Sequence, residues 1–377
     1  MAYGRQGIWR GWDRFDYLLM LAALALVGFG LVLIYSASLQ EYEGPVASYA
    51  NPVTKQVIFA FIGVIAMVVV SKIDYHYLTH YSWLFYALGL VSLVAIFLIG
   101  DSAFGSRRWF AVGPLQVQPS EFAKIATILV LARYFSEHGG DARDLRTLVG
   151  SLVIVAPAAG LVFVQPDLGT SIVFFAIWLG VVIVAGVSRS HLLVMGAIFL
   201  AVLPFVWTFA IADYQVERVS VLVDSEEDPL DAGYNVNQSK IAVGSGQLTG
   251  AGLTNGEQTQ HGFLKVPTKD FIFSVLSEEL GFIGAMVLFA LFIFLLMRGI
   301  RAAQIAGDPA GQLVAVGIVM LILMQTFINI AVNVSIFPVT GIPLPFVSQG
   351  GSSLVSLFIS LGMLQSIVMR HRAYRQT

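Results

Sequence analysis

The chain contains no cysteine among its 377 residues, and it carries few charges of either sign. The lack of cysteine excludes disulfides, thiol catalysis and zinc–thiolate sites together. Charged residues make up 12% of the sequence and the formal net charge is -2, so nothing indicates a nucleic-acid partner. An ordinary soluble domain carries roughly twice this share of charged residues. The composition therefore excludes a typical soluble protein.

Hydrophobic residues supply 57% of the sequence, and the mean hydropathy is +0.80. A membrane-spanning helix needs about 20 mostly apolar residues, and runs of that length recur throughout the chain. We therefore expect an all-α polytopic membrane protein, with a single integral membrane domain over 1–377 and about ten helices. The expected helices are 15–37, 56–72, 82–99, 120–136, 147–164, 169–187, 191–212, 271–297, 312–333 and 350–369. The two helices that flank "VQPDLGTS" could instead be one broken helix with a re-entrant turn.

The distribution of lysine and arginine predicts the orientation in the membrane, because basic residues are enriched in cytoplasmic loops. No cleavage pattern follows the first apolar run, so we expect a retained first helix and both termini in the cytoplasm. The inner segments then hold Arg5, Arg10, Arg14, Lys72, Arg133, Arg143, Arg146, Arg189, Arg298, Arg301, Arg370, Arg372 and Arg375. The outer segments hold Lys55, Arg107, Arg108, Arg218, Lys240, Lys265 and Lys269. Every unusual polar stretch lies outside, including a large loop over 213–270 between the seventh and eighth helices.

Three carboxylates stand at the start of the expected eighth helix, in "VPTKDFIFSVLSEELGFIG". Asp270 could simply cap the helix, since a carboxylate there accepts backbone N–H groups. Alternatively, partial desolvation at the edge of the membrane raises a carboxylate's pKa and suits it to accept a proton. Asp270, Ser274 and Glu278 drift along one broad helix face, whereas Glu279 points elsewhere. Buried acids in membrane helices are costly, which makes them candidates for a functional site.

A second cluster lies in "GSRRWFAVGPLQVQPSEFAK", where Pro119 suits the first turn of a helix. Glu121 and Lys124 are three residues apart, so they could form a local ion pair that neutralises two charges entering the membrane. The functional alternative is that Lys124, Arg107 and Arg108 supply positive charge for a phosphate-bearing ligand. Trp109 would then be a platform beside them, although a lone tryptophan is often only an interface anchor.

Two further stretches break the helical pattern. The glycine-rich "GYNVNQSKIAVGSGQLTGAGLTNGEQ" could be a flexible linker, but interleaved apolar residues favour a loop packed on the membrane domain. The segment "NVSIFPVTGIPLPFVSQGGSSL" cannot continue a helix because of its prolines and glycines. Broken backbone at this depth must be buried in protein or line a cavity, and both explanations remain open.

Six stretches, in this order and spacing, resemble the SEDS family (shape, elongation, division, sporulation): "GSRRWF", "QPSEFAK", "QPDLGTS", "GYNVNQSKIAVGSGQLTGAGL", "DFIFSVLSEELGFIG" and "TGIPLPFVSQGGSSL". The compact termini look more like the rod-shape branch than the division branch. The resemblance implies peptidoglycan glycosyltransfer from lipid II at the outer face of the bacterial cytoplasmic membrane. It also implies a class B penicillin-binding protein as partner, together with other membrane proteins of the elongation complex.

The resemblance carries over to particular residues. The family's essential acid falls on Asp270, its loop tryptophan on Trp109, and its paired acid and lysine on Glu121 and Lys124. The full set of expected substrate-binding residues is Trp109, Arg107, Arg108, Glu121, Lys124, Arg218, Gln238, Ser239, Glu278 and Ser348. No cofactor is certain, although a divalent metal (Mg²⁺ or Mn²⁺) with Asp270 as a ligand stays open. The sequence departs from the commoner family pattern at Val266, Lys269 and Gln349, and Lys269 would favour the charged form of Asp270.

Three functions compete. A glycosyltransferase needs one base for the acceptor hydroxyl and positive charge for the departing diphosphate, which Asp270 and the basic residues could supply. A transporter or lipid II flippase predicts ionisable residues near the bilayer midplane, whereas here the polar motifs gather on the outer side. A non-catalytic scaffold would leave the buried acids unexplained. Together with the activity that the family resemblance implies, this comparison leads us to expect a peptidoglycan glycosyltransferase.

Overall fold

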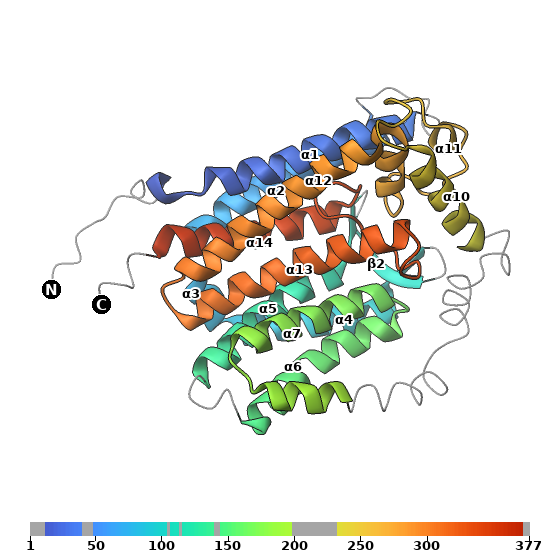
Figure 1. Ribbon diagram of the computed structural model, residues 1–377. Coiled ribbons are helices and arrows are strands. Elements are labelled where there is room, and N and C mark those ends of the chain that lie inside the picture. Colours follow the sequence, from blue (N-terminus) through green and yellow to red (C-terminus); the bar gives the residue numbers. More distant parts are fainter. Residues whose placement is uncertain are drawn as a thin grey trace.

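The computed structural model describes residues 12–39, 48–103, 106–112, 115–138, 144–197 and 232–371, and it is built mainly of long helices (Figure 1). A short 3-10 helix, Trp12–Arg14, precedes them. The helices are α1 Tyr17–Ser38, α2 Pro52–Lys72, α3 Tyr75–His80, α4 Ser82–Ile99, α5 Pro119–Glu137, α6 Leu145–Val164, α7 Leu168–Val184, α10 Ala232–Ser245, α11 Glu257–Gln260, α12 Ile272–Ile305, α13 Pro309–Asn333 and α14 Gly351–Arg370.

Seven of these helices are long and apolar enough to cross a membrane: α1, α2, α4, α6, α12, α13 and α14. Helix α7 is apolar but shorter, and α5 has a more polar sequence that is mostly buried. The expected helix 191–212 begins in residues 189–197, which are helical, and its remainder lies outside the described residues. These helices confirm the expected polytopic membrane fold. Helices α6 and α7 pack against each other and α6 alone is long enough to cross a membrane, which favours two helices over a single broken one.

Local sequence explains where several helices begin. Side chains of Asp16, Asn51, Asp144, Asp167 and Asp308 each accept a backbone N–H in the first turn of the following helix. Such caps satisfy amide groups that have no partner inside the helix. Helices α2, α5 and α13 also have proline in the first turn, where its fixed φ suits the helix.

The first and last helices meet at one end of the bundle. The backbone N–H of Asp16 donates a 2.8 Å hydrogen bond to Oε1 of Gln365, and Arg298 forms a 2.6 Å ion pair with the carboxylate of Asp16. Helices α10 and α11 and strand β2 lie at the opposite end (Figure 1). The start of α1, the end of α14 and the short helix α3 therefore lie far from the loop region.

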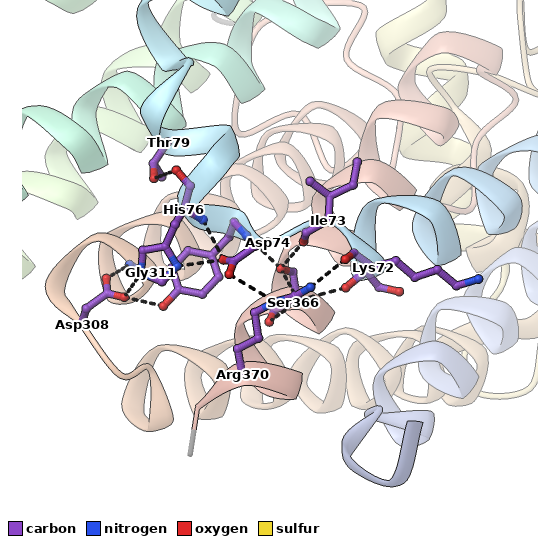
Figure 2. Close-up of polar contacts among 11 residues, drawn as sticks. Lys72, Ile73, Asp74, His76, Thr79, Asp308, Gly311, Ser366 and Arg370 are labelled. Carbon is purple, nitrogen blue, oxygen red and sulfur yellow. Dashed lines mark hydrogen bonds and ion pairs between the residues drawn. The ribbon is translucent and has the colours of Figure 1, made fainter. Parts of the chain in front are cut away.

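A polar cluster joins α3 to α13 and α14 at the end of the bundle where Asp16 meets Gln365 (Figure 2). The two ring nitrogens of His76 each lie 2.8 Å from a carboxylate oxygen, one on Asp74 and one on Asp308. The hydroxyl of Tyr75 also donates to Asp308. Arg370 lies 3.6 Å from Asp74 and donates to the carbonyl of Lys72 at 2.7 Å. The cluster joins the α2–α3 turn to α13 and α14.

A small antiparallel sheet departs from the all-α expectation. Its strands are β1 Asp101–Ala103, β2 Ser106–Val112 and β3 Leu115–Val117, in the order β1-β2-β3. Strand β2 packs against α4 and α5, and β3 packs against α14. The sheet places the "GSRRWF" stretch beside the start of α5.

The glycine-rich stretch docks into a break in α12. Gly281 has φ 64° and ψ -161°, so the helix is interrupted there. The N–H groups of Ala251 and Gly252 donate to the carbonyls of Glu278 and Glu279, at 2.9 and 3.0 Å. Gly250 also has a positive φ, and a Cβ there would lie 2.2 Å from the carbonyl oxygen of Glu279. The described part of the large loop, 232–270, is therefore packed on the membrane helices rather than a flexible linker.

Candidate active site

Asp270 lies just outside the first turn of α12, where it is half-buried. The cap position belongs to Phe271, whose side chain cannot accept a hydrogen bond, so Asp270 is not the N-cap of the helix. Its carboxylate faces Gly341, since a Cβ on that glycine would lie 3.9 Å from Oδ2 of Asp270. The carboxylate thus stands between the loop before α12 and the proline-rich segment before α14.

Hydrogen bonds join these two segments directly. The hydroxyl of Ser348 donates to the carbonyl of Lys269 at 2.6 Å and accepts from the N–H of Leu344 at 2.9 Å. The N–H of Gln349 donates to the carbonyl of Thr268 at 2.9 Å. Ser348 thus stabilises the backbone next to Asp270, which gives this expected site residue a clear structural part.

Two amides from α13 hold the backbone of Asp270 itself. The carbonyl of Asp270 accepts Nδ2–H of Asn333 at 2.9 Å and of Asn329 at 3.1 Å. Asn333 Oδ1 in turn accepts the N–H of Ser274 at 3.0 Å. We did not expect either asparagine at the site, although two amides four residues apart in a mostly apolar helix were a weak signal in the sequence.

Helix α10 reaches the same network through Ser239. Its hydroxyl donates to the carbonyl of Asn333 at 2.8 Å and lies 2.6 Å from the hydroxyl of Ser274. The neighbouring Gln238 is half-buried on the same helix. The structure therefore brings Ser239 into the surroundings of Asp270, while a substrate contact by either residue remains a prediction.

Glu121 and Lys124 form a buried ion pair in the first turns of α5. Lys124 Nζ lies 2.8 Å from Oε1 of Glu121, and the two side chains are 1% and 3% exposed, respectively. Oε2 of Glu121 accepts the hydroxyl of Ser356 on α14 at 3.0 Å. This geometry fits the local neutralisation of two charges, and the contact of Lys124 with a phosphate group remains a prediction.

Arg108 fastens strand β2 to the turn between α6 and α7. Its Nε donates to the carbonyl of Gln165 at 3.0 Å, its terminal nitrogen donates to the carbonyl of Pro166, and the guanidinium lies 3.7 Å from Asp167. Trp109 follows on the same strand and is half-buried. The side chain of the third expected residue on this strand, Arg107, lies outside the described residues.

The turn that binds Arg108 also approaches the segment that faces Asp270. A Cβ on Gly169, in the first turn of α7, would lie 2.6 Å from the side chain of Thr340 and 2.7 Å from that of Ile342. Glycine at this position lets the helix start and the 340–342 segment approach closely. The hairpin of strands β2 and β3, which carries Arg107 and Arg108, is therefore linked to the Asp270 region through the start of α7.

Glu278 and Glu279 have different surroundings from Asp270. The carboxylate of Glu278 accepts the N–H groups of Gln258 and Thr259 at 2.6 and 3.1 Å and the Thr259 hydroxyl at 2.7 Å. Glu278 thus caps α11 from a neighbouring helix, and it is almost fully buried. Glu279 accepts the hydroxyl of Ser36 at 2.5 Å. Both acids hold the loop on α1 and α12, and the expected substrate contact of Glu278 remains a prediction.

The remaining expectations concern a metal ion and one arginine. Within the ranges that the structure describes, no group of three or more His, Asp or Glu side chains could hold a metal ion. Arg218 lies outside those ranges. The site that emerges consists of Asp270, two backbone-holding asparagines, the Ser239–Ser274 pair and Ser348, with the Arg108 hairpin linked through α7.

Comparison with known proteins identifies the family. Residues 16–373 match the model of the FtsW/RodA/SpoVE family, described as "Cell cycle protein". Stage V sporulation protein E of Bacillus subtilis (strain 168) is 39% identical over 93% of this chain and 96% of its own length. The peptidoglycan glycosyltransferase MrdB of Escherichia coli (strain K12) is 37% identical over 94% of each chain.

Solved structures agree with this family. A chain from a peptidoglycan synthase complex that coordinates polymerization and crosslinking superposes with a TM-score of 0.80 at 28% identity, covering 96% of this chain and 99% of that one. The rod shape determining protein RodA of Thermus thermophilus gives a TM-score of 0.69 at 26% identity, covering 96% and 98%.

The chain therefore belongs to the FtsW/RodA/SpoVE family, the SEDS proteins that the six sequence stretches resemble. It is a polytopic membrane enzyme, and its activity is that of a peptidoglycan glycosyltransferase. Both findings confirm the expectations from the sequence.

Proposed function

We propose that this enzyme polymerises lipid II into glycan strands during cell elongation, with Asp270 as the general base. The acceptor sugar hydroxyl attacks the anomeric carbon of a lipid-linked donor, its proton passes to the Asp270 carboxylate, and the lipid diphosphate leaves. Direct displacement inverts the anomeric carbon. The observation that carries the proposal is the placement of Asp270, a half-buried carboxylate outside the regular helix and fixed through its backbone by α13.

The departing diphosphate needs positive charge close to the base. Arg107 and Arg108 stand on the hairpin beside α5, and Lys124 lies buried behind it. Contacts with the α6–α7 turn already fix the Arg108 side chain, so its guanidinium would need little reorganisation to bind the diphosphate. We propose that these three basic side chains bind the diphosphate.

The site faces the outside of the bacterial cytoplasmic membrane, with both ends of the chain in the cytoplasm. Basic groups at the opposite end support this orientation: Arg298 pairs with Asp16, Arg370 donates to the carbonyl of Lys72, and the ammonium of Lys72 lies over the ring of Trp12. Basic residues concentrate on the cytoplasmic side of membrane proteins. A class B penicillin-binding protein is the proposed partner, and other elongation-complex membrane proteins assemble with the pair.

The decisive experiment is polymerisation of labelled lipid II by the purified enzyme, alone and with a class B penicillin-binding protein. Polymer should form with the unaltered chain and fall sharply with Asp270→Asn. Vesicles with lipid II in one leaflet, assayed in parallel, measure transfer between leaflets. Transfer without polymer, with every partner tried, would replace this proposal by a lipid II flippase.

A further inference from the structure

Asn333 holds the chain on both sides of Phe271, the residue that follows Asp270. Its amide nitrogen donates to the carbonyl of Asp270 at 2.9 Å, and its oxygen accepts the N–H of Ser274 at 3.0 Å. Ser274 is the third residue of α12, where a helix cap normally accepts its hydrogen bond. The side chain of Phe271 cannot act as that cap. The N–H of Ser274 donates to the Phe271 carbonyl at 3.0 Å, and the side-chain cap comes from Asn333 on another helix.

Asn329 lies one turn earlier on α13 and holds the opposite wall. Its amide nitrogen donates to the carbonyls of both Asp270, at 3.1 Å, and Ile342, at 2.9 Å. Ile342 follows Gly341, the residue that faces the carboxylate of Asp270. One side chain therefore fixes the spacing between the loop that carries the acid and the segment opposite it.

Burying the two side-chain amides costs free energy unless they form hydrogen bonds. Asn333 is 0% exposed and Asn329 is 2% exposed, in a helix that is otherwise mostly apolar. A buried amide without partners destabilises a protein, whereas leucine would pack in the same place without that cost. The amides therefore serve the backbone groups that they bind, and two of their bonds end on the Asp270 carbonyl.

We infer that Asn333 and Asn329 are positioning residues that set the direction of the Asp270 carboxylate. This inference rests on the proposed function, because that function makes Asp270 the proton acceptor. Asp270 precedes the regular helix, so helix geometry alone does not fix its backbone. A general base must lie within hydrogen-bond reach of the proton that it accepts, and a 1 Å displacement can cost about 10²-fold in rate.

The test compares three substitutions on α13: Asn333→Leu, Asn329→Leu and Gln325→Leu. Gln325 is the matched control, because it is a 1% exposed amide on the same helix and its Oε1, like Oδ1 of Asn329, has no hydrogen-bond partner within the described ranges. It differs from Asn329 in lacking the bonds from the amide nitrogen to the carbonyls of Asp270 and Ile342. Each variant is purified with the partner, and kcat and KM for lipid II are measured per folded molecule beside the melting temperature. Both asparagine variants should lose about tenfold or more in kcat with KM little changed, and Gln325→Leu should keep the unaltered kcat.

A purely structural role gives a different result. It would lower the melting temperature of the asparagine variants while the folded molecules kept a normal kcat, and that outcome would overturn the inference. If Asn333→Leu does not fold, Asn329→Leu decides, since it leaves the cap on Ser274 intact. Asp270→Asn is assayed alongside. A fully active Asp270→Asn overturns the proposed function and the positioning together, whereas an inactive Asp270→Asn with normal asparagine variants overturns the positioning alone.

Discussion

The hydroxyl of Ser348 donates a 2.6 Å hydrogen bond to the carbonyl of Lys269, so the segment before α14 is held against the residue that precedes Asp270. We predict that Ser348→Ala lowers kcat several-fold and removes about 1 to 3 kcal/mol of stability, because the Lys269 carbonyl and the Leu344 N–H both lose their bond to the hydroxyl. Ser360→Ala is the control, because among the residues that the structure describes that hydroxyl bonds only the carbonyl of Ser356, one turn back in its own helix. Lipid II polymerisation and thermal unfolding of both variants check the prediction. Equal kcat values would contradict it.

Asp270→Asn keeps the shape of the side chain but cannot accept a proton at neutral pH. The variant should fold and bind its partner, yet polymerise lipid II roughly 10²-fold or more slowly, the scale of general-base catalysis. The cap position of α12 belongs to Phe271, so loss of a cap would not explain such a result. Glycan chain length and initial rate are the measurements. Near-normal polymer from well-folded Asp270→Asn would remove Asp270 from the catalytic role.

The buried pair of Glu121 and Lys124 gives a prediction that separates the effect of a buried charge on stability from a role of Lys124 in catalysis. Lys124→Met alone leaves a carboxylate buried without its cation, which should cost about 3 to 5 kcal/mol. The double variant Glu121→Gln with Lys124→Met should recover most of that loss, because no uncompensated charge remains. Thermal unfolding in detergent measures the recovery. If the stable double variant polymerises normally, Lys124 does not hold the diphosphate.

Two glycines of the docked loop should respond oppositely to alanine. Gly250→Ala meets the carbonyl oxygen of Glu279 and a positive φ that L-residues adopt at a cost of about 1 to 2 kcal/mol, so it should destabilise the loop. Gly244→Ala lies in helix α10 with nothing within 4 Å of its Cβ, and it should stabilise by up to about 1 kcal/mol. Protease cleavage within 246–260 reports the difference. Similar cleavage of both variants would argue against the docked loop.

The cluster around His76 predicts a stability effect at the other end of the bundle (Figure 2). His76→Phe loses contacts to both Asp74 and Asp308, and it should lower stability by about 1 to 3 kcal/mol with little change in kcat. Glu137→Gln removes the exposed Arg133 pair as a comparison, which should cost no more than about 0.5 kcal/mol. Melting temperatures of the two variants test this order, and a reversed order would count against the cluster.

Hydropathy located the long helices well because spanning length is a strong constraint. The expected 82–99 coincides with α4, and 312–333 lies within α13. The short elements α3, α10 and α11 and the strands were not expected, since they are polar and too short to be stable without tertiary contacts. The expected helix 271–297 continues to Ile305. Its break at Gly281 depends on contacts with residues 246–252, which lie too far back in the sequence for a local pattern to reveal.

Of the candidate site, the sequence pointed to Asp270, Ser239 and Ser348, but not to the two asparagines that hold the backbone of Asp270. Asp270 and the Glu121–Lys124 pair stood out because charges are rare in this chain. Asn329 and Asn333 did not, because neutral amides give a weak signal and their partners are backbone groups of a distant segment. The caps that Glu278 and Asn333 provide to other helices depend on tertiary contacts that no sequence spacing reveals.

The docking of residues 246–252 on the break in α12 has a consequence for the order in which the protein is made. Both partners belong to one continuous stretch of chain, so they can pair as soon as α12 has been synthesised. Asp270, by contrast, needs Asn333 on α13 and the segment around Ser348, which leave the ribosome later. A nascent chain that ends after α12 can therefore carry the docked 246–252 segment but no formed site, and the site is complete only when the last helices are in place.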